Sequence, residues 1–462
     1  MHVNVVNADA GIHNPDNPIS GFAGIPRNMT GIASKLKSAG YATHMVGKWD
    51  AGMATPDHSP RGRGYDTDLI YFHHANDYWT SVIDAKSSND PACNVPLTDL
   101  WAGTGGAKTL NQSWHCSQVN QTGCIYEDEI FAEEVLARIA AHDPDTPFFL
   151  FWAPHIGHAP LQVPQAYLDK FAFIDNIERR FYAAMINYVD GLVGRIVAAL
   201  KAKGMWDDLL WVSSADNGGP IYADGDAGAN NWPMRGGKMS NWQGGIRVNA
   251  YASGGYLPAA VVGTKNDGLM VGADIYSTFC ALAGVDPTDD RAAAVSLPPI
   301  DGYNMWPWLS GAATVSPRTE VPVASDAVEA NLYQLGHMTV VQAIVRNDGW
   351  KLLIGATGQN IWTGPQYPNT TTNWIDKPYQ CGIPAFANYP VTGKGGCLFN
   401  VLTDPTEHDD VANANPAIVA ELMARILVWQ TTAFSPNRGY YDNLACEAAI
   451  HNHSGYWGPF LP

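Results

Sequence analysis

Residues 31–52, "GIASKLKSAGYATHMVGKWDAG", carry the first helix and strand signals of the chain. Its first part, 31–40, has apolar residues at helical spacing and closes at Gly40, so we predict an amphipathic helix there. The next part, 41–50, predicts a strand that ends in a turn, with Lys48 and Asp50 at its end. A lysine at this place is either an ordinary solvated residue or a cation at the edge of an active site.

The same alternation of helix and strand continues along the chain. We predict a helix over 127–142, with the acidic first turn that a helix dipole favours, and an aromatic, fully buried strand over 147–155. A long helix within 174–203 and a second buried strand within 208–219 follow. Strands and helices in this order predict the α/β class: a three-layer α/β/α sandwich around a large, mostly parallel sheet.

The pattern changes near residue 320. Two short strands around an Asn-Asp-Gly turn are predicted within 343–356, and a helix over 416–434. We therefore expect two domains, a large one over 1–320 and a smaller α+β domain with an antiparallel sheet over 321–462.

Charge and composition exclude several classes of function. The chain has 44 acidic and 27 basic residues and a formal net charge of −17. This balance argues against general binding of nucleic acids or anionic membranes, because no excess of Lys and Arg is present to neutralise phosphates. We also expect no membrane span, since no apolar run reaches the length needed to cross a bilayer.

Cysteines and glycosylation motifs favour the secretory pathway. Of seven cysteines, Cys116 with Cys124 and Cys381 with Cys397 flank short loops that disulfides could close, and the odd total leaves one thiol over. Five N-x-S/T motifs are glycosylation candidates: Asn28, Asn111, Asn120, Asn369 and Asn452. The sequence shows no signal peptide at Met1, so we expect Met1 to be an internal methionine of a longer protein.

Polar residues follow three of the predicted strands. They are Lys48 and Asp50, then His155 and His158 in "PHIGHAPLQVP", then Asp216 and Asn217 in "SADNGG"; a glycine-rich segment, 230–247, adds Arg235 and Lys238. Ligands of open α/β sheets bind at the carboxyl ends of the strands.

Each of these features also has a plain structural explanation. "DNGG" alone is a turn, a single histidine beside a proline is usually a hydrogen-bonded loop residue, and a single lysine is usually solvated. Together they suit a multiply charged oxyanion. Asp and Asn oxygens are ligands for Ca²⁺ or Mg²⁺, Lys supplies a positive charge, and His can protonate a leaving alkoxide or phenoxide.

These segments resemble the sulfatase family, and within it the arylsulfatase B-like branch. The resemblance runs over nearly the whole chain, through "LKSAGYATHMVGKWDAG", "RGRGYDT", "HAPLQVP", "SADNGG", "GANNWPMRGGKMSNWQGGIR" and "CLFNVLTDPTEHDDVA". It implies the alkaline-phosphatase-like fold and hydrolysis of sulfate esters with a bound Ca²⁺. The implied ligand is a sulfated saccharide or a small sulfated aryl compound.

The resemblance also assigns roles to individual positions. It implies that Lys48, His158 and Lys238 contact sulfate, and that Asp216 and Asn217 bind the metal. Candidates for the substrate rim are Arg235, Trp232 and Trp242 of the glycine-rich segment, and Tyr222 before it.

The chain departs from the family pattern in three ways. Asp50 stands where the family has a histidine; an aspartate there repels a sulfate group unless it is neutralised. No C/S-x-P-S-R motif, which supplies the formylglycine nucleophile of the family, is present, and the paired Asp-Asp that completes the metal site is missing. We expect both elements upstream of residue 1, and therefore an open slot, or a substitute segment, beside the strand that ends at Lys48.

Three functions remain open at this point. The first is an arylsulfatase-like hydrolase, inactive in the chain as given because its nucleophile is missing. The second is a non-catalytic sulfatase-like protein that binds anions or partners. The third is a two-metal phosphodiesterase of the wider superfamily, for which the expected additional Asp/His metal clusters are not evident.

Overall fold

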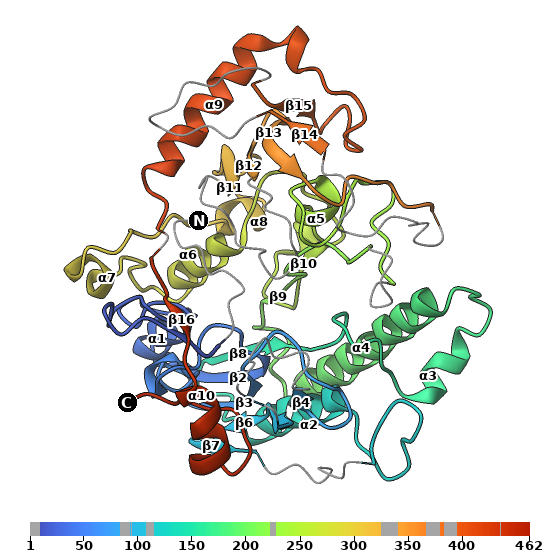
Figure 1. The fold of residues 1–462 in the computed structure, drawn as a ribbon, viewed down its shortest axis with the longest axis vertical. Coiled ribbons are helices and arrows are strands. Elements are labelled where there is room, and N and C mark those ends of the chain that lie inside the picture. The colour runs from blue at the N-terminus through green and yellow to red at the C-terminus, as the bar shows by residue number, and fades with distance from the viewer. Residues whose placement is uncertain are drawn as a thin grey trace.

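The fold has a larger α/β part and a smaller antiparallel sheet above it (Figure 1). The computed structural model describes residues 10–83, 93, 95–107, 115–221, 228–324, 341–365, 379–382, 395–434 and 436–462. All structural statements below refer to these residues.

The larger part is built on a five-stranded sheet in the order β7-β6-β3-β2-β8. Strand β2 (Ala42–Lys48) pairs in parallel with both β3 (Thr67–Tyr71) and β8 (Phe148–Ala153). The short strands β6 (Trp101–Ala102) and β7 (Gly105–Gly106) continue it in antiparallel fashion. Residues 43–47 of β2 are buried, because this strand has a neighbour at each edge and a helical layer on each face. The predicted α/β class is confirmed, and the sheet is mixed.

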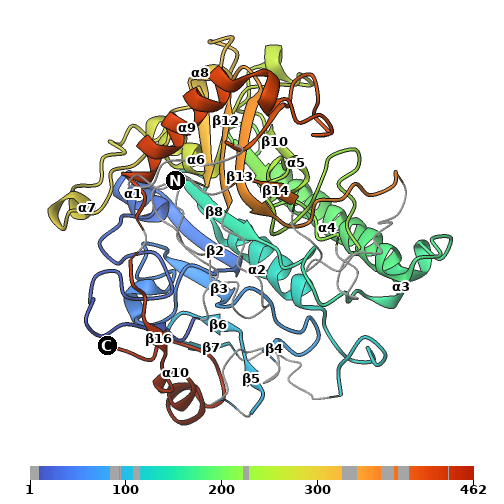
Figure 2. The same ribbon diagram turned by 45° about the horizontal axis from the view of Figure 1, so that its top comes forward.

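Helices cover both faces of this sheet (Figure 2). On one face, α2 (Glu127–Ala141) and α4 (Ile177–Ala202) pack through Phe131 and Ile196 onto Val46. On the other, α1 (Ile32–Ser38) packs against β2, and α6 (Gly272–Leu282) packs against α1. The predicted helices within 31–40, 127–142 and 174–203 are confirmed. Helix α4 starts at its cap residue Asn176, whose side chain accepts a hydrogen bond from the Arg179 amide.

Helix α4 is an exception to the expectation that no apolar segment is long enough to cross a membrane. By length and composition alone it is long and apolar enough to cross a membrane. Its buried residues instead face the protein core: Ala184, Met185, Tyr188, Leu192, Ile196 and Leu200. They share two core clusters with residues of α2 and β8, which is the packing of an amphipathic core helix.

The sheet is interrupted beside β8, not beside β2. In the described part of the chain, β8 pairs with β2 alone, while β9 (Trp211–Ser214) pairs only with β10 (Ala250–Ser253). The expected open slot next to the strand ending at Lys48 is therefore wrong. The predicted full burial of β8 and β9 is also wrong, since both are mostly half-buried and Phe151 is 49% exposed. Trp211 of β9 nevertheless shares a core cluster with Trp152 of β8, so both strands pack on the same helical layer.

The smaller sheet is antiparallel, as predicted. Its order is β11 (Glu320–Ala324), β12 (Val341–Arg346), β13 (Trp350–Thr357) and β14 (Tyr379–Cys381), and β15 (Cys397–Asn400) also pairs with β13. The predicted Asn-Asp-Gly turn joins β12 to β13, with Gly349 at φ 90°. Helix α9 (Pro416–Gln430) packs Leu422 and Ile426 onto Ile344 and Leu352 of this sheet.

The end of the chain returns to the larger part. Strand β16 (Tyr440–Tyr441) pairs with β1 (Ile12–His13). Helix α10 (Leu444–Glu447) carries Cys446, which is bonded to Cys93, and Trp457 lies in the core cluster that contains Met45 and Ile70. The expected second domain covers 321–462, whereas the end of the chain packs on the larger part. Hydrophobic patterning alone does not show which core a C-terminal segment joins.

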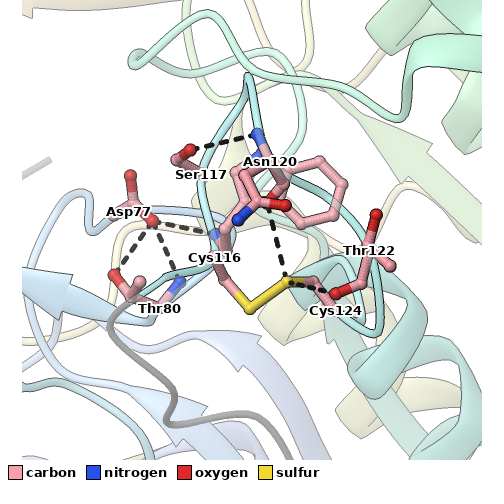
Figure 3. The surroundings of a disulfide bond; sticks show 8 residues. Asp77, Thr80, Cys116, Ser117, Asn120, Thr122 and Cys124 are labelled. Atoms are coloured by element: carbon pink, nitrogen blue, oxygen red, sulfur yellow. Dashed lines mark hydrogen bonds between the residues drawn. A yellow bond between two sulfur atoms is a disulfide. The ribbon is translucent and has the colours of Figure 1, made fainter.

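The predicted disulfides Cys116–Cys124 and Cys381–Cys397 are both present, and Cys280 is a buried free thiol. Figure 3 shows the first of them closing the loop that carries Asn120. Because both sulfurs are bonded to each other, the adjacent His115 has no thiolate partners for a metal. The remaining short elements are β4 (Val82–Ile83), β5 (Leu97–Thr98), α3 (Gln165–Lys170), α5 (Gln243–Ile246), α7 (Asp290–Ala294) and α8 (Trp306–Leu309).

Candidate functional site

The site begins where β2 ends. Beyond Lys48 the chain continues alongside β3, since the amides of Trp49 and Asp50 donate to the carbonyls of Tyr71 and Phe72. Asp50 has φ 45°, a left-handed conformation that aspartate tolerates better than most residues. This turn brings the Asp50 carboxylate to 3.4 Å from the Lys48 ammonium. Asp50 is thus partly neutralised, as a site for an anion requires.

The loop after β8 supplies a histidine to the same place. The Tyr78 hydroxyl lies 2.9 Å from the carbonyl oxygens of both His155 and His158 and fixes the loop. The Nδ1 atom of His158 lies 2.9 Å from the Ala159 carbonyl, which can only accept, so Nδ1 carries the proton. Its Nε2 atom then accepts a hydrogen bond from the Lys238 ammonium at 2.7 Å.

The electrostatic effects of these groups on one another's pKa values show that they lie close together. Burial lowers the pKa of Lys238, the charge of Lys48 lowers it further, and Asp216 and Asp50 act in the opposite direction. Burial and then Lys238 lower the pKa of His158 to about 3. His158 is therefore a neutral acceptor at neutral pH in this structure. That state does not fit the expected donation of a proton to a leaving group.

His155 has a different place from the one its sequence neighbourhood indicates. Its ring is buried and stacks on Tyr78, and its Nδ1 lies 2.9 Å from a carboxylate oxygen of Glu127. Its backbone amide donates to Asp128. Burial raises the pKa of Glu127 to about 8 and raises that of Asp128 well above its usual value. Glu127 and Asp128, in the acidic first turn of α2, thus hold the loop after β8 in place. This role is additional to any interaction with the helix dipole.

Asp216 and Asn217 follow β9 and are the oxygen donors that were predicted to bind a metal. Asp216 is exposed, and its carboxylate accepts a hydrogen bond from the Asn217 amide at 2.8 Å. A Cβ on Gly218 would lie 1.7 Å from the Gly244 carbonyl oxygen, so only glycine allows this close approach to α5. Ca²⁺ takes six to eight oxygen ligands, so this pair alone would not fill its coordination shell. The donors have the right chemistry but are too few for a complete site.

Two of the candidates for the substrate rim are interior residues. Arg235 is buried, and its guanidinium lies 3.8 Å from the ring centroid of Trp242, which is itself fully buried. Arg235 also donates to the carbonyls of Asn360 and Glu407. The prediction of a rim role for Arg235 and Trp242 is therefore wrong, because both join the glycine-rich segment to the smaller sheet. Trp232 is 54% exposed, and Tyr222 lies outside the described residues.

His74 is a site residue that was not predicted from the sequence. It follows β3, and its Nδ1 lies 3.7 Å from the second carboxylate oxygen of Asp50. Burial raises the pKa of Asp50, but the interactions with His74 and Lys48 outweigh it, so that the pKa is lowered overall. The available signal was "FHHAND" directly after a strand parallel to β2, the same kind of position that identified Lys48.

The glycosylation candidates differ in accessibility. Asn120 and Asn452 are exposed, and Asn28 is half-buried. Asn111 and Asn369 lie outside the described residues.

Known proteins resemble this chain in sequence and in fold. The family model described as Sulfatase matches residues 6–285. Arylsulfatase J of Mus musculus is 31% identical over 446 residues, covering 94% of this chain and 67% of that protein. N-acetylgalactosamine-6-sulfatase of Homo sapiens is 28% identical over 288 residues, or 62% of this chain and 49% of that protein. The chain thus spans about two thirds of the first relative and half of the second.

Solved structures agree on the fold. Ps i-CgsB in complex with k-i-k-neocarrahexaose matches with a TM-score of 0.66 at 22% identity, over 96% of this chain and 83% of that one. A sulfatase from Pseudoalteromonas sp., PsFucS1, matches with a TM-score of 0.60 at 21% identity, over 93% and 78%. Lys48, His158 and Lys238 thus lie at strand ends and loops of a fold that known sulfatases share, and the family model matches more than half of the sequence. The chain belongs to the sulfatase family, a family of sulfuric ester hydrolases.

Proposed function

We propose that this chain binds the sulfate group of a sulfate monoester at the ammonium groups of Lys48 and Lys238, beside His158, whose Nε2 accepts a hydrogen bond from Lys238 and positions it. The observation that supports this most directly is the 2.7 Å contact of Lys238 with His158, in a region where the charge of Lys48 lowers the pKa of both residues. Two ammonium groups that repel each other favour a bound anion, and a sulfate monoester supplies one. In this site the Asp50 carboxylate lies 3.4 Å from the Lys48 ammonium, whose charge offsets it, so it does not exclude the anion.

We further propose that hydrolysis in the full-length protein uses a Ca²⁺-assisted formylglycine nucleophile. Asp216 and Asn217 would hold the metal, which would stabilise developing negative charge when bound. The 462 residues contain no C/S-x-P-S-R motif. A non-catalytic protein that binds sulfated ligands or partners is accordingly the second candidate.

We expect the chain as given to bind sulfate but to hydrolyse aryl sulfates negligibly. Loss of the nucleophile in covalent catalysis costs on the order of 10⁴-fold or more. Two measurements check this: turnover of a chromogenic aryl sulfate, and titration calorimetry with inorganic sulfate. Lys48→Met and Lys238→Met should each weaken sulfate binding roughly 10-fold or more, because each removes a charged hydrogen-bond donor.

The matched control for that experiment is Lys265→Met. Lys265 has 80% of its side chain exposed and pairs with Asp267, so its loss should leave the affinity for sulfate unchanged. Rapid turnover by the unmodified chain would contradict the expected inactivity, and an unchanged affinity in both site variants would contradict the binding site.

Ca²⁺ should bind weakly to this chain, with a Kd on the order of 10⁻⁴ M or higher, because water must replace most of the protein oxygens of a full site. Calorimetry with CaCl₂ measures this affinity, and Asp216→Ala should abolish the remaining heat signal. Sub-micromolar affinity, or an unchanged signal in Asp216→Ala, would show that other residues complete the site.

We also propose a class of ligand and a cellular compartment, from the charges, disulfides and glycosylation motifs of the chain. A sulfated saccharide or sulfated small molecule suits the charges of the site, and the net charge of −17 supports the absence of nucleic acid as a partner. Three disulfides and the exposed sequons Asn120 and Asn452 support a secretory-pathway, glycosylated protein.

A further inference from the structure

His74 is the second imidazole at the site, and its surroundings differ from those of His158. The Nε2 atom of His158 is occupied by Lys238 at 2.7 Å. The Nδ1 atom of His74 is buried and has no hydrogen-bond partner within 3.5 Å in the described part of the chain. The nearest group that can pair with it is the Asp50 carboxylate, at 3.7 Å.

The exposure of His74 shows which edge of its ring is available to a ligand. The side chain is 37% exposed, although Nδ1 is buried. Nδ1 is the one nitrogen of this ring that is buried without a partner in the described part of the chain, so we infer that the exposed part is the edge that carries Nε2. His74 thus presents one nitrogen to Asp50 and the other to solvent beside the site.

Asp50 connects this ring to the proposed sulfate-binding residues. One carboxylate oxygen lies 3.4 Å from the Lys48 ammonium and the other lies 3.7 Å from His74. A carboxylate can only accept, so a neutral His74 that faces it carries its proton on Nδ1. The exposed Nε2 is then a hydrogen-bond acceptor, which suits a hydroxyl group and does not suit a sulfate oxygen. The contact of 3.7 Å is long for a hydrogen bond, as is common in sites without ligand.

We propose that His74 determines specificity by accepting, at Nε2, a hydrogen bond from a hydroxyl group beside the sulfate of the ligand, while Asp50 holds Nδ1–H. The ligand class is a hydroxyl-bearing sulfated saccharide. This inference rests on the proposed sulfate site, which supplies the neighbouring anchor.

The first test measures the tautomer of His74 in the free protein at neutral pH, by two-bond ¹H–¹⁵N correlation after ¹⁵N-histidine labelling. His74→Ala assigns the signal. We expect the Nδ1–H form in the wild type and a shift toward Nε2–H in Asp50→Asn, whose amide can donate to Nδ1. An Nε2–H tautomer or an imidazolium in the wild type overturns the proposal without reference to any ligand.

The second test compares two probes by calorimetry, inorganic sulfate and galactose 6-sulfate. His74→Ala should weaken binding of the sulfated sugar about 2- to 10-fold, the loss of one hydrogen bond, with less than a twofold change for sulfate. His451→Ala, at an exposed histidine in the C-terminal segment, is the control and should change neither. An equal loss for both probes, or no loss for the sugar, overturns the role of His74. Failure of the wild type to bind either probe overturns the sulfate site and this role together, whatever the tautomer.

Discussion

Gly47→Ala should destabilise the protein by about 3–5 kcal/mol and abolish measurable binding of sulfate. A Cβ at this position would lie 2.0 Å from the carbonyl oxygen of Ala153, and this backbone atom belongs to the paired strand β8. Gly47 also has φ 100°, which L-residues rarely adopt. Steric overlap and backbone strain each cost about 1–3 kcal/mol, out of a total of about 5–15 kcal/mol. Urea denaturation measures the loss of free energy of unfolding.

Gly40→Ala is the matched control for the steric effect. Gly40 has φ 87°, but a Cβ there meets no atom within 4 Å. The variant should therefore lose only about 1–2 kcal/mol and keep its affinity for sulfate. If the two alanine variants were equally stable, the close approach of β2 and β8 at Gly47 would not be the constraint we infer. Lys48 follows Gly47 directly, so displacement of β2 from β8 would also separate Lys48 from His158.

Lys351→Met should cost about 3–5 kcal/mol of stability. The Lys351 ammonium lies 2.6 Å from Glu407, and both side chains are fully buried. Burial lowers the pKa of Lys351, and Glu407 opposes this effect. Removal of one partner leaves a buried charge without compensation. The same substitution should also weaken sulfate binding. Glu407 accepts a hydrogen bond from the amide of Gln243 at the start of α5, and the segment that carries Lys238 lies just before this helix.

The double variant Lys351→Met/Glu407→Gln separates the charge from the packing. It should recover part of the lost free energy of unfolding, because the uncompensated Glu407 carboxylate is gone. The recovery should be incomplete, because the buried guanidinium of Arg235 then loses the opposing charge of Glu407. Lys265→Met removes an exposed ion pair and should change stability by less than about 1 kcal/mol. A double variant as unstable as the single one would show that the volume of the lysine chain, and not its charge, supports this region.

The local elements, and the strand ends that carry Lys48 and His158, were predictable from the sequence. Helices α1, α2 and α4 and the β12–β13 hairpin follow from residue periodicity and turn residues, which act over a few positions. The convergence of Lys48 and His158 followed from strand order, because the carboxyl ends of neighbouring parallel strands meet at one edge. The disulfides Cys116–Cys124 and Cys381–Cys397 close short loops and were likewise accessible from spacing.

Contacts between distant parts of the chain establish which polar residues are buried and which partners they have. Arg235 and Lys238 are three residues apart, yet Arg235 stacks on Trp242 in the interior while Lys238 reaches His158. His74 is a site residue because it approaches Asp50. The C-terminal segment joins the larger part through the β1–β16 pair, the Cys93–Cys446 disulfide and Trp457. The physical reason is that burial and pairing depend on contacts between residues far apart in the chain, which local periodicity does not encode.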